Sequence, residues 1–375
     1  RLNNDVEDCY WSMTTSYQGG RIMKAFVLAE PGKVQWYNAP EPELTPYGAI
    51  LEPIAVTPCS SDVHTVFGGG SPKQPNLVLG HESIGRVVAV GEYVKDFKIG
   101  DKVAVPAITP DWREKSIQEG NDRHASAPFS GHQLGRTQPG VFSERYLIKD
   151  ADTTLAHIPE GITDEQALMS VDVVTTGFTG AEYADIKFGD TVCVIGIGPI
   201  GLMAVAGARL RGAGKIIAIG TRPVCVELAK QYGANQVLSY KEGDIVEQIK
   251  EITHGVGVDS TIIAGGTVEV LEQAYDMTRY GIGTISNINY FGGKGYLPLP
   301  IFSGGRGMCG KTLHMELAKG GRTRIERIMS MIENGRVDPS PLITHHMYGL
   351  ERVEDALYLM RDKPDNLVKV MVHCK

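Results

Sequence analysis

Short apolar runs separated by glycine and proline follow one another from Met23 to about Val105. Examples are "AFVLAEPG", "AILEPIAVTP", "IGRVVAVG" and "DKVAVPAI". Apolar runs of this length between turn residues are typical of short β-strands. We therefore expect a β-rich, barrel-like unit in this part of the chain.

The pattern changes twice before the middle of the chain. Residues 109–140 are polar and irregular, which predicts a long loop. From Thr163 the segment "TDEQALMSVDVVTTGFTGAEYA" turns helical, with Thr163 as the N-cap and acidic residues in the first turn.

After Asp190 apolar strands alternate with helical segments, which predicts an α/β unit with a doubly wound parallel sheet. The expected strands are 191–197, 215–220, 236–240, 260–265 and 283–288. Towards the end of the chain, an amphipathic helix over 322–335 and a strand over 368–374 are expected.

Composition narrows the possible classes of partner. The net charge is -7 and no basic block stands out, which argues against nucleic acid. No apolar run approaches the roughly 20 residues that cross a bilayer. The cysteines form no C-x-x-C pair, which favours a reducing, cytoplasmic compartment over a disulfide framework. They are residues 9, 59, 193, 225, 309 and 374.

Three glycines, Gly196, Gly198 and Gly201, follow the first expected strand of the sheet and open a helix. In a dinucleotide site, one glycine makes the tight turn, one admits the pyrophosphate, and one lets helix and strand pack closely. The pyrophosphate then faces the N-terminus of the helix. The motif alone is weak evidence, but here the strand, the helix and a second strand are in register.

At the end of the second strand, an NAD site has an acidic residue that binds the ribose hydroxyls. This chain has Gly220, Thr221 and Arg222 there. A hydroxyl donor and a permanently charged guanidinium suit a 2′-phosphate. We therefore expect NADP(H), with a solvated surface role for Arg222 as the alternative.

Four residues far apart in sequence could bind a metal: Cys59, His81, Glu82 and Asp172. A thiolate, an imidazole and carboxylates are a reasonable set of zinc ligands. Asp172 stands among apolar neighbours, where an unpaired carboxylate would be costly to bury. The alternatives are an apolar packing role for the cysteine, a structural histidine, and a helix cap for the aspartate.

The segment "GHESIGRVVAVGEYV", followed by "GDKVAV", closely resembles the zinc signature of medium-chain alcohol dehydrogenases. The similarity continues through "TPCSSDVHTVF", "PAITPDWR", "TTGFTGAE", "GIGPIGLMAVAGARLRGAGKIIAIGTRPVC", "YFG" and "MRDKP". From Met23 to the C-terminus, the chain resembles the NADP-linked secondary alcohol dehydrogenases. This resemblance implies a GroES-like catalytic domain (23–175 and 317–375) and a Rossmann domain (176–316). Residues 1–22 are interpreted as a leader or arm of unknown role, without the apolar core of a secretory signal.

The resemblance assigns further roles. It implies Cys59, His81 and Asp172 as zinc ligands, with Glu82 as a fourth ligand in some states. The other assignments are a proton relay through Ser61 and His64, a phosphate contact at Tyr240, and a substrate pocket that includes Ala107, Ile108 and His132.

Two departures from the family pattern are informative. No cysteine lies between residues 59 and 193, so the four-cysteine structural zinc of many relatives is not expected. His132 stands where close relatives have a tryptophan in the wall of the substrate pocket, so a wider substrate range is expected.

The resulting hypothesis is a zinc-dependent reductase that moves a hydride between NADP(H) and a secondary alcohol, ketone or aldehyde, as a homotetramer. A polyol or sugar dehydrogenase of the same fold is the first alternative, although "PAITP" and "TTGF" are rather apolar for gripping several hydroxyls. A zinc-free, NADPH-binding relative with a structural role is the second, and it would be expected to lack the metal ligands.

Overall fold

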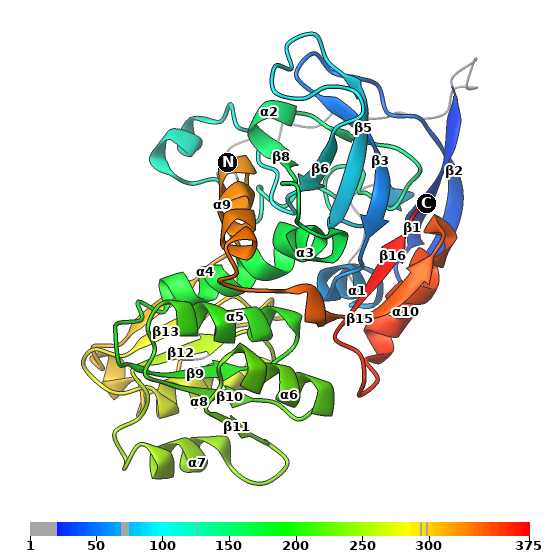
Figure 1. The fold of residues 1–375 in the computed structure, drawn as a ribbon. Helices are drawn as coiled ribbons and strands as arrows, with labels where there is room; N and C mark the ends of the chain where they lie inside the picture. Colours follow the sequence, from blue (N-terminus) through cyan, green and yellow to red (C-terminus); the bar gives the residue numbers. More distant parts are fainter. Residues whose placement is uncertain (1–20, 69–74, 126, 293–294, 298) are drawn as a thin grey trace, which may run out of the picture.

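The computed structural model describes residues 21–68, 75–125, 127–292, 295–297 and 299–375. The segment 1–20, and with it most of the expected leader, lies outside the described residues. Figure 1 shows two lobes: strands β1 to β8 with β15 and β16 form one, and the sheet that contains β9 to β13 forms the other.

One lobe is built on a six-stranded sheet in which every neighbouring pair is parallel. The order is β11-β10-β9-β12-β13-β14. After β9 the chain adds β10 and β11 on one side of that strand, and then β12, β13 and β14 on the other side. The strands are β9 (Thr191–Ile195), β10 (Lys215–Ile219), β11 (Gln236–Leu238), β12 (Ser260–Ile263), β13 (Thr284–Asn287) and β14 (Thr312–Met315). This confirms the doubly wound sheet and its five expected strands, while β14 was not foreseen.

Both faces of this sheet are covered, which explains why its strands are apolar throughout. Val192 and Val194 point into one hydrophobic cluster, and Cys193 and Ile195 point into another on the opposite face. The helices α4 to α6 contribute to the first cluster, and α7 and α8 to the second. Their bounds are α4 (Thr175–Tyr183), α5 (Pro199–Leu210), α6 (Pro223–Tyr232), α7 (Ile245–Ile252) and α8 (Glu269–Met277).

The β-rich lobe contains a seven-stranded sheet with the path β15-β16-β3-β5-β6-β8, in which β7 also pairs with β3. A three-stranded sheet, β2-β1-β4, lies beside it. The strands are β1 (Ile22–Glu30), β2 (Lys33–Pro40), β3 (Ala49–Val56), β4 (Leu77–Val78), β5 (Ser83–Val90), β6 (Lys102–Val105), β7 (Tyr146–Ile148), β8 (Ala156–His157), β15 (Ile343–Tyr348) and β16 (Lys369–His373). Because β16 pairs antiparallel with β3, the end of the chain returns to the sheet formed by its beginning.

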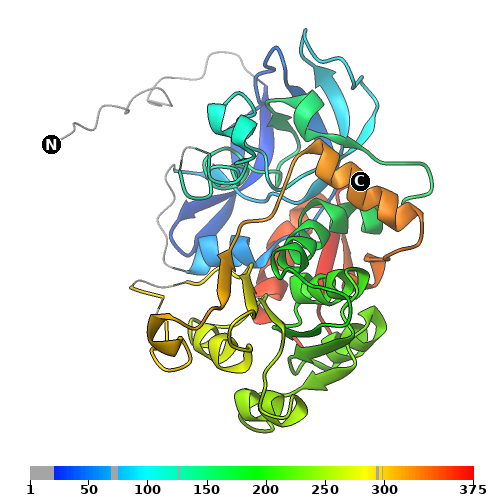
Figure 2. The same cartoon turned by 90° about the vertical axis from the view of Figure 1, so that its left-hand side faces the viewer.

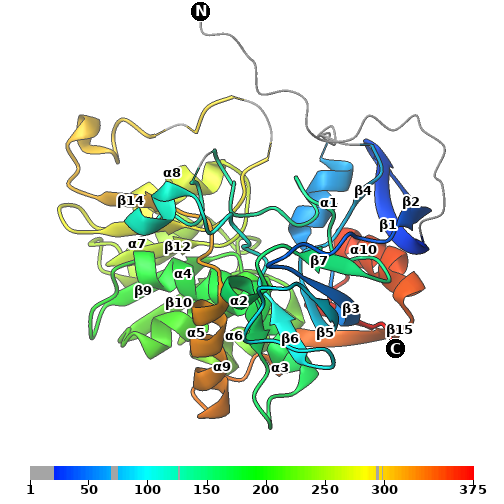
Figure 3. The same cartoon turned by 90° about the horizontal axis from the view of Figure 1, so that it is seen from above.

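A nearly continuous helical run lies between the two lobes, which Figure 3 shows side by side from above. It consists of α3 (Asp164–Met169), a π-helical turn η2 (Ser170–Val174) and α4. Thr163 caps it as expected, since its hydroxyl accepts from the backbone of Gln166 and the Gln166 side chain accepts from the backbone of Thr163. The π-turn was not foreseen, and it contains Asp172.

The remaining helices mainly cover the β-rich lobe. Helix α9 (Arg322–Glu333) packs against α2 and β8, and Figure 2 shows it in orange beside that lobe. The others are α1 (Ser60–Phe67), α2 (Ala151–Thr154), α10 (Val353–Asp362), η1 (Lys115–Glu119), η3 (Gly305–Gly307), η4 (Ser340–Leu342) and η5 (Leu350–Arg352). In the described part of the chain, no helix has the length and apolarity needed to cross a bilayer.

Candidate metal centre and nucleotide site

The structure brings together the four candidate metal ligands. One donor atom from each of Cys59, His81, Glu82 and Asp172 lies within 4.8 Å of the others, and all four residues are buried. Cys59 caps helix α1, the His-Glu pair immediately precedes β5, and Asp172 lies in the π-turn. Three segments that are distant in sequence therefore meet at one point.

Asp62 fixes the geometry of this cluster from behind. Its carboxylate accepts hydrogen bonds from the backbone N–H groups of Cys59 (2.8 Å) and Gly80 (3.3 Å). It also lies 3.5 Å from Nδ1 of His81, which leaves Nε2 of that ring on the side of the cluster. Burial lowers the pKa of His81, but Asp62 and Cys59 outweigh burial and raise this pKa well above its ordinary value. The surroundings thus favour a positive charge here.

The Asp172 carboxylate is also oriented. Its Oδ1 accepts a hydrogen bond of 2.9 Å from the Thr176 hydroxyl, one helical turn later. Its Oδ2 lies 3.8 Å from Sγ of Cys59 and 4.0 Å from Nε2 of His81. One oxygen is thus used for positioning, and the other faces the remaining donors.

Behind Glu82 lies a residue that the sequence did not point to. Nζ of Lys369 donates to Oε1 of Glu82 (2.6 Å) and to the carbonyl of Pro58 (3.1 Å), and both charged side chains are inaccessible to solvent. Burial raises the pKa of Glu82 to about 7, although Lys369 opposes the rise. Burial lowers the pKa of Lys369, but Glu82 outweighs it and the net shift is upward. The sequence feature that could have identified Lys369 is its position as a single charged residue inside the apolar strand "VKVMV".

The donor set fits a zinc ion. Oε2 of Glu82 is buried without a hydrogen-bond partner among the described residues. A thiol, an imidazole and two carboxylates within one small space match the ligand types that zinc prefers. A buried polar atom left without a partner costs roughly 1–3 kcal/mol, and a cation in this space would remove that cost.

Ser61 and His64 lie on helix α1, next to the cluster. The hydroxyl of Ser61 is 3.3 Å from Nε2 of His81 and half-buried. His64 is one turn further along and exposed, with its ring 5.7 Å from that of Tyr290. Burial lowers the pKa of His64, and nearby Lys363 adds to this effect. The helix thus leads from the buried cluster to solvent, and Tyr290 is a neighbour that the sequence did not indicate.

The expected pocket residues lie beside the cluster. Ala107 and Ile108 are buried, and the N–H of Ala107 donates to the carbonyl of Val171, next to Asp172. The His132 ring meets the His81 ring edge-on, with centroids 4.7 Å apart. Burial lowers the pKa of His132 to about 3, and the charge on His81 adds to the shift.

Two buried polar atoms in this region have no hydrogen-bond partner among the described residues: Nε2 of His132 and Oγ1 of Thr109. Their segments are joined, because the N–H of Thr109 donates to the carbonyl of Gly131 over 2.7 Å. The region around the expected pocket residues is therefore less apolar than the sequence "PAITP" indicated.

The glycine loop has the expected geometry at the C-terminal end of β9. Gly196 has φ +86°, and a Cβ there would lie 2.7 Å from Cα of Gly265. A Cβ on Gly201 would lie 1.8 Å from the carbonyl oxygen of Gly196, so this contact between strand and helix requires glycine. Gly198 caps α5, and a Cβ there would make only an ordinary contact, 3.8 Å from Nη2 of Arg222.

The residues that replace the expected acid lie together. The Thr221 hydroxyl donates to the Tyr240 hydroxyl over 3.1 Å. Arg222 donates to the carbonyl of Leu367, and its Nη2 is 3.8 Å from the Cβ position of Gly198. A Cβ on Gly220 would lie 2.2 Å from Cγ1 of Ile197, so a side chain at this position would require the Ile197 side chain to shift. The Arg222 guanidinium thus lies beside the glycine loop, and the two hydroxyls of the neighbouring segments are hydrogen-bonded to each other.

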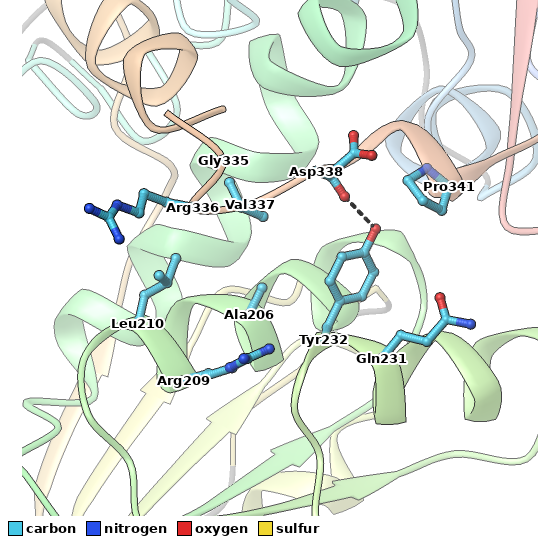
Figure 4. Close-up of a pocket in the computed structure, with 10 residues that line it drawn as sticks. All are labelled: Ala206, Arg209, Leu210, Gln231, Tyr232, Gly335, Arg336, Val337, Asp338 and Pro341. Atoms are coloured by element: carbon cyan, nitrogen blue, oxygen red, sulfur yellow. Dashed lines mark hydrogen bonds between the residues drawn. The ribbon is translucent and has the colours of Figure 1, made fainter. Parts of the chain in front are cut away.

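A surface hollow of about 520 Å³ lies elsewhere, between α5, α6 and the segment 335–341. Figure 4 shows its lining, including the Tyr232 hydroxyl that donates to the carbonyl of Asp338 over 2.9 Å. No residue of the metal cluster or of the glycine loop lines this hollow. We therefore place the candidate active site at the donor cluster, which contains the thiol, the imidazole and the carboxylates, and not at this hollow.

Comparison with known proteins agrees with these features. The family model "Alcohol dehydrogenase GroES-like domain" matches residues 46–160, and "Zinc-binding dehydrogenase" matches 199–319. The chain is 50% identical to the NADP-dependent isopropanol dehydrogenase of Thermoanaerobacter brockii, over 93% of this chain and 99% of the relative. It is 47% identical to that of Entamoeba histolytica, over 95% and 97%. A solved alcohol dehydrogenase from Thermus sp. ATN1 is 27% identical, with a TM-score of 0.83 over 94% of this chain and 100% of that chain.

Proposed function

We infer that this chain, which belongs to the zinc-binding alcohol dehydrogenases, transfers a hydride reversibly between NADP(H) and a secondary alcohol or ketone. The observation that carries the proposal is the buried cluster of Cys59, His81, Glu82 and Asp172. The relatives named above are NADP-dependent isopropanol dehydrogenases, which favours a small secondary alcohol, or the corresponding ketone, as the substrate.

Cys59, His81 and Asp172 would hold one zinc ion per subunit, with Glu82 as a further ligand in some states. Bound there, zinc would polarise the oxygen of the carbonyl group and stabilise the charge that develops on it. Asp62 and Thr176 would keep His81 and Asp172 in position, as the hydrogen bonds described above indicate. We propose no structural zinc, since no cysteine lies between residues 59 and 193.

Ser61 and His64 would move the proton of the reaction. The Ser61 hydroxyl is close enough to His81 Nε2 to reach a group bound at the cluster, and it can hold a proton at Oγ. His64 is exposed on the same helix and would exchange that proton with solvent. The donor residues are buried, which would limit the access of water to a bound substrate.

NADP(H) would supply or accept the hydride. Gly196, Gly198 and Gly201 would admit its pyrophosphate, which would face the N-terminus of α5. Thr221, Arg222 and Tyr240 would bind the 2′-phosphate, because hydroxyl donors and a guanidinium suit that group. Gly220 would leave this phosphate without a repelling carboxylate.

Ala107, Ile108 and His132 would form the wall of the substrate pocket. An imidazole fills less of an apolar site than the indole of relatives does, so we propose tolerance of larger carbonyl compounds. The unpartnered Nε2 of His132 and Oγ1 of Thr109 also favour a second candidate, a dehydrogenase acting on hydroxylated substrates such as polyols. A substrate hydroxyl would satisfy such atoms.

We further propose a catalytic domain of residues 23–175 and 317–375, and a cofactor domain of residues 176–316. The free cysteines among the described residues support a cytoplasmic location.

A homotetramer is supported by the β14 edge of the parallel sheet, near which large apolar side chains are exposed. These side chains are Tyr296, Leu299, Phe302 and Met308.

The zinc site is tested by Asp172→Asn, which keeps the shape but removes a charge, and by His81→Ala, which removes a donor. We expect zinc affinity to fall by more than about 100-fold, since even indirect partners of metal ligands account for roughly 10–100-fold. Turnover should fall with it, while NADPH still binds to the separate glycine loop. Metal analysis and fluorescence titration with NADPH measure both. Full activity of either variant would contradict the ligand assignment.

Cofactor preference is tested by Arg222→Ala combined with Tyr240→Phe. Hydrogen bonds to a charged group are worth roughly 1.5–3 kcal/mol, so the preference for NADPH over NADH should fall by about 10–100-fold. The measurement is kcat/KM with each cofactor. This double variant is a better test than Gly220→Asp, because the aspartate would also force the Ile197 side chain to move. Equal efficiency of the unmodified enzyme with both cofactors would refute the assignment.

Substrate class is tested with butan-2-one and 4-hydroxybutan-2-one, which share a carbon chain, and with a bulkier aryl methyl ketone. His132→Trp should reduce kcat/KM for the aryl ketone. If hydroxylated substrates are preferred, His132→Phe should lower the ratio of kcat/KM for 4-hydroxybutan-2-one to that for butan-2-one by about tenfold, which corresponds to the loss of one hydrogen bond. An unchanged profile in both variants would show that His132 lies outside the pocket.

Assembly is tested by sedimentation at the working concentration. We expect a tetramer, and Phe302→Asp should weaken it because a charge would be placed among exposed apolar side chains. A monomeric unmodified protein would exclude the proposed assembly.

A further inference from the structure

A buried ion pair lies directly behind the donor cluster. Lys369, in the last strand, and Glu82, before β5, are 287 residues apart in sequence and have exposed fractions of 1% and 0%. Replacing a buried ion pair with apolar residues is often neutral or stabilising, because removing two charges from water is costly. The pair therefore calls for an explanation other than stability.

The position of the ammonium group gives that explanation. Lys369 Nζ contacts Glu82, the neighbour of His81, and the carbonyl of Pro58, the neighbour of Cys59. It thus touches the chain next to two of the candidate metal ligands. It holds one oxygen of Glu82, while the other has no hydrogen-bond partner in the described part of the chain and the carboxylate lies within the donor cluster. One oxygen of the Glu82 carboxylate is thus held by Lys369, and the carboxylate can also reach the position that a metal ion would occupy.

We propose that Lys369 is a positioning residue that competes with the metal for Glu82 and so keeps one coordination position free for the substrate. This inference rests on the zinc site of the proposed function. A zinc ion with four protein ligands is typical of closed structural sites, whereas catalytic sites have three protein ligands and an open position. Lys369 biases the site towards the open form.

The charges support this division. Apart from the Asp62–His81 pair, Cys59, Glu82 and Asp172 supply three negative charges when ionised, and zinc and Lys369 would supply three positive charges beside them. Without the ammonium group, the zinc ion becomes the nearest cation for Glu82, and the attraction between opposite charges at this range is strong in a buried site. Glu82 would then stay on the metal and occupy the position that the substrate needs.

The test compares Lys369→Met, which removes the charge, with Lys369→Arg, which keeps it, each alone and together with Glu82→Gln. We expect Lys369→Met to slow the release of zinc to a chelator by about tenfold, an effect of the size that partners of metal ligands produce. It should also shift the visible absorption of the cobalt(II)-substituted protein and raise KM for butan-2-one. Lys369→Arg should resemble the unmodified protein in all three measurements.

The Glu82→Gln background separates positioning from a general structural role. There, Lys369→Met should no longer change zinc release or the cobalt spectrum, because the competing carboxylate is absent. Equal effects of Lys369→Met in both backgrounds, or no effect in either, would overturn the inference. If Lys369→Met does not fold, Lys369→Gln keeps a hydrogen-bond donor without the charge and should show the same changes more weakly. A protein that binds no zinc at all would instead refute the proposed function.

Discussion

The candidate site depends on one buried carboxylate that does not itself belong to the donor cluster. Asp62 accepts hydrogen bonds from the backbone at Cys59 and Gly80 and faces Nδ1 of His81. Those contacts tie the first turn of α1 to the segment before β5. The cost of burying the Asp62 charge is offset by hydrogen bonds and by the imidazole, and these lower its pKa despite burial. The position of the ligand donors follows from this arrangement.

The rest of the fold brings two further elements to the same place. The π-turn between α3 and α4 carries Asp172, and strand β16 carries Lys369 back to the first sheet. The glycine loop lies where the chain reverses direction across the parallel sheet, which is where open α/β sheets bind their ligands. The parallel sheet and a helical run shared by both lobes thus position the candidate metal site and the candidate nucleotide site.

Much of the fold could be predicted from local pattern. The apolar strands of the parallel sheet are buried on both faces, and Thr163 has the capping residues of a helix start, so both were predicted correctly. Strand β14 was missed because only two of its four residues are apolar and it lies at the edge of the sheet. The candidate ligands were chosen by residue type and family resemblance. Asp62 was missed because its contacts with Gly80 and His81 join segments that are distant in sequence. The lysine in "VKVMV" could have been singled out as a buried charge, but its partner Glu82 is 287 residues away and no local pattern identifies it.

The close packing of Gly220 against Ile197 has a consequence for how this enzyme can change over evolutionary time. A carboxylate at position 220 would give the ribose contact of an NAD enzyme, but any side chain there first collides with the isoleucine. A single substitution at this position therefore carries the cost of shifting the Ile197 side chain, which a smaller residue at 197 would remove. The residue at 197, and not the number of phosphate contacts alone, thus affects the paths by which this lineage can exchange one nicotinamide cofactor for the other.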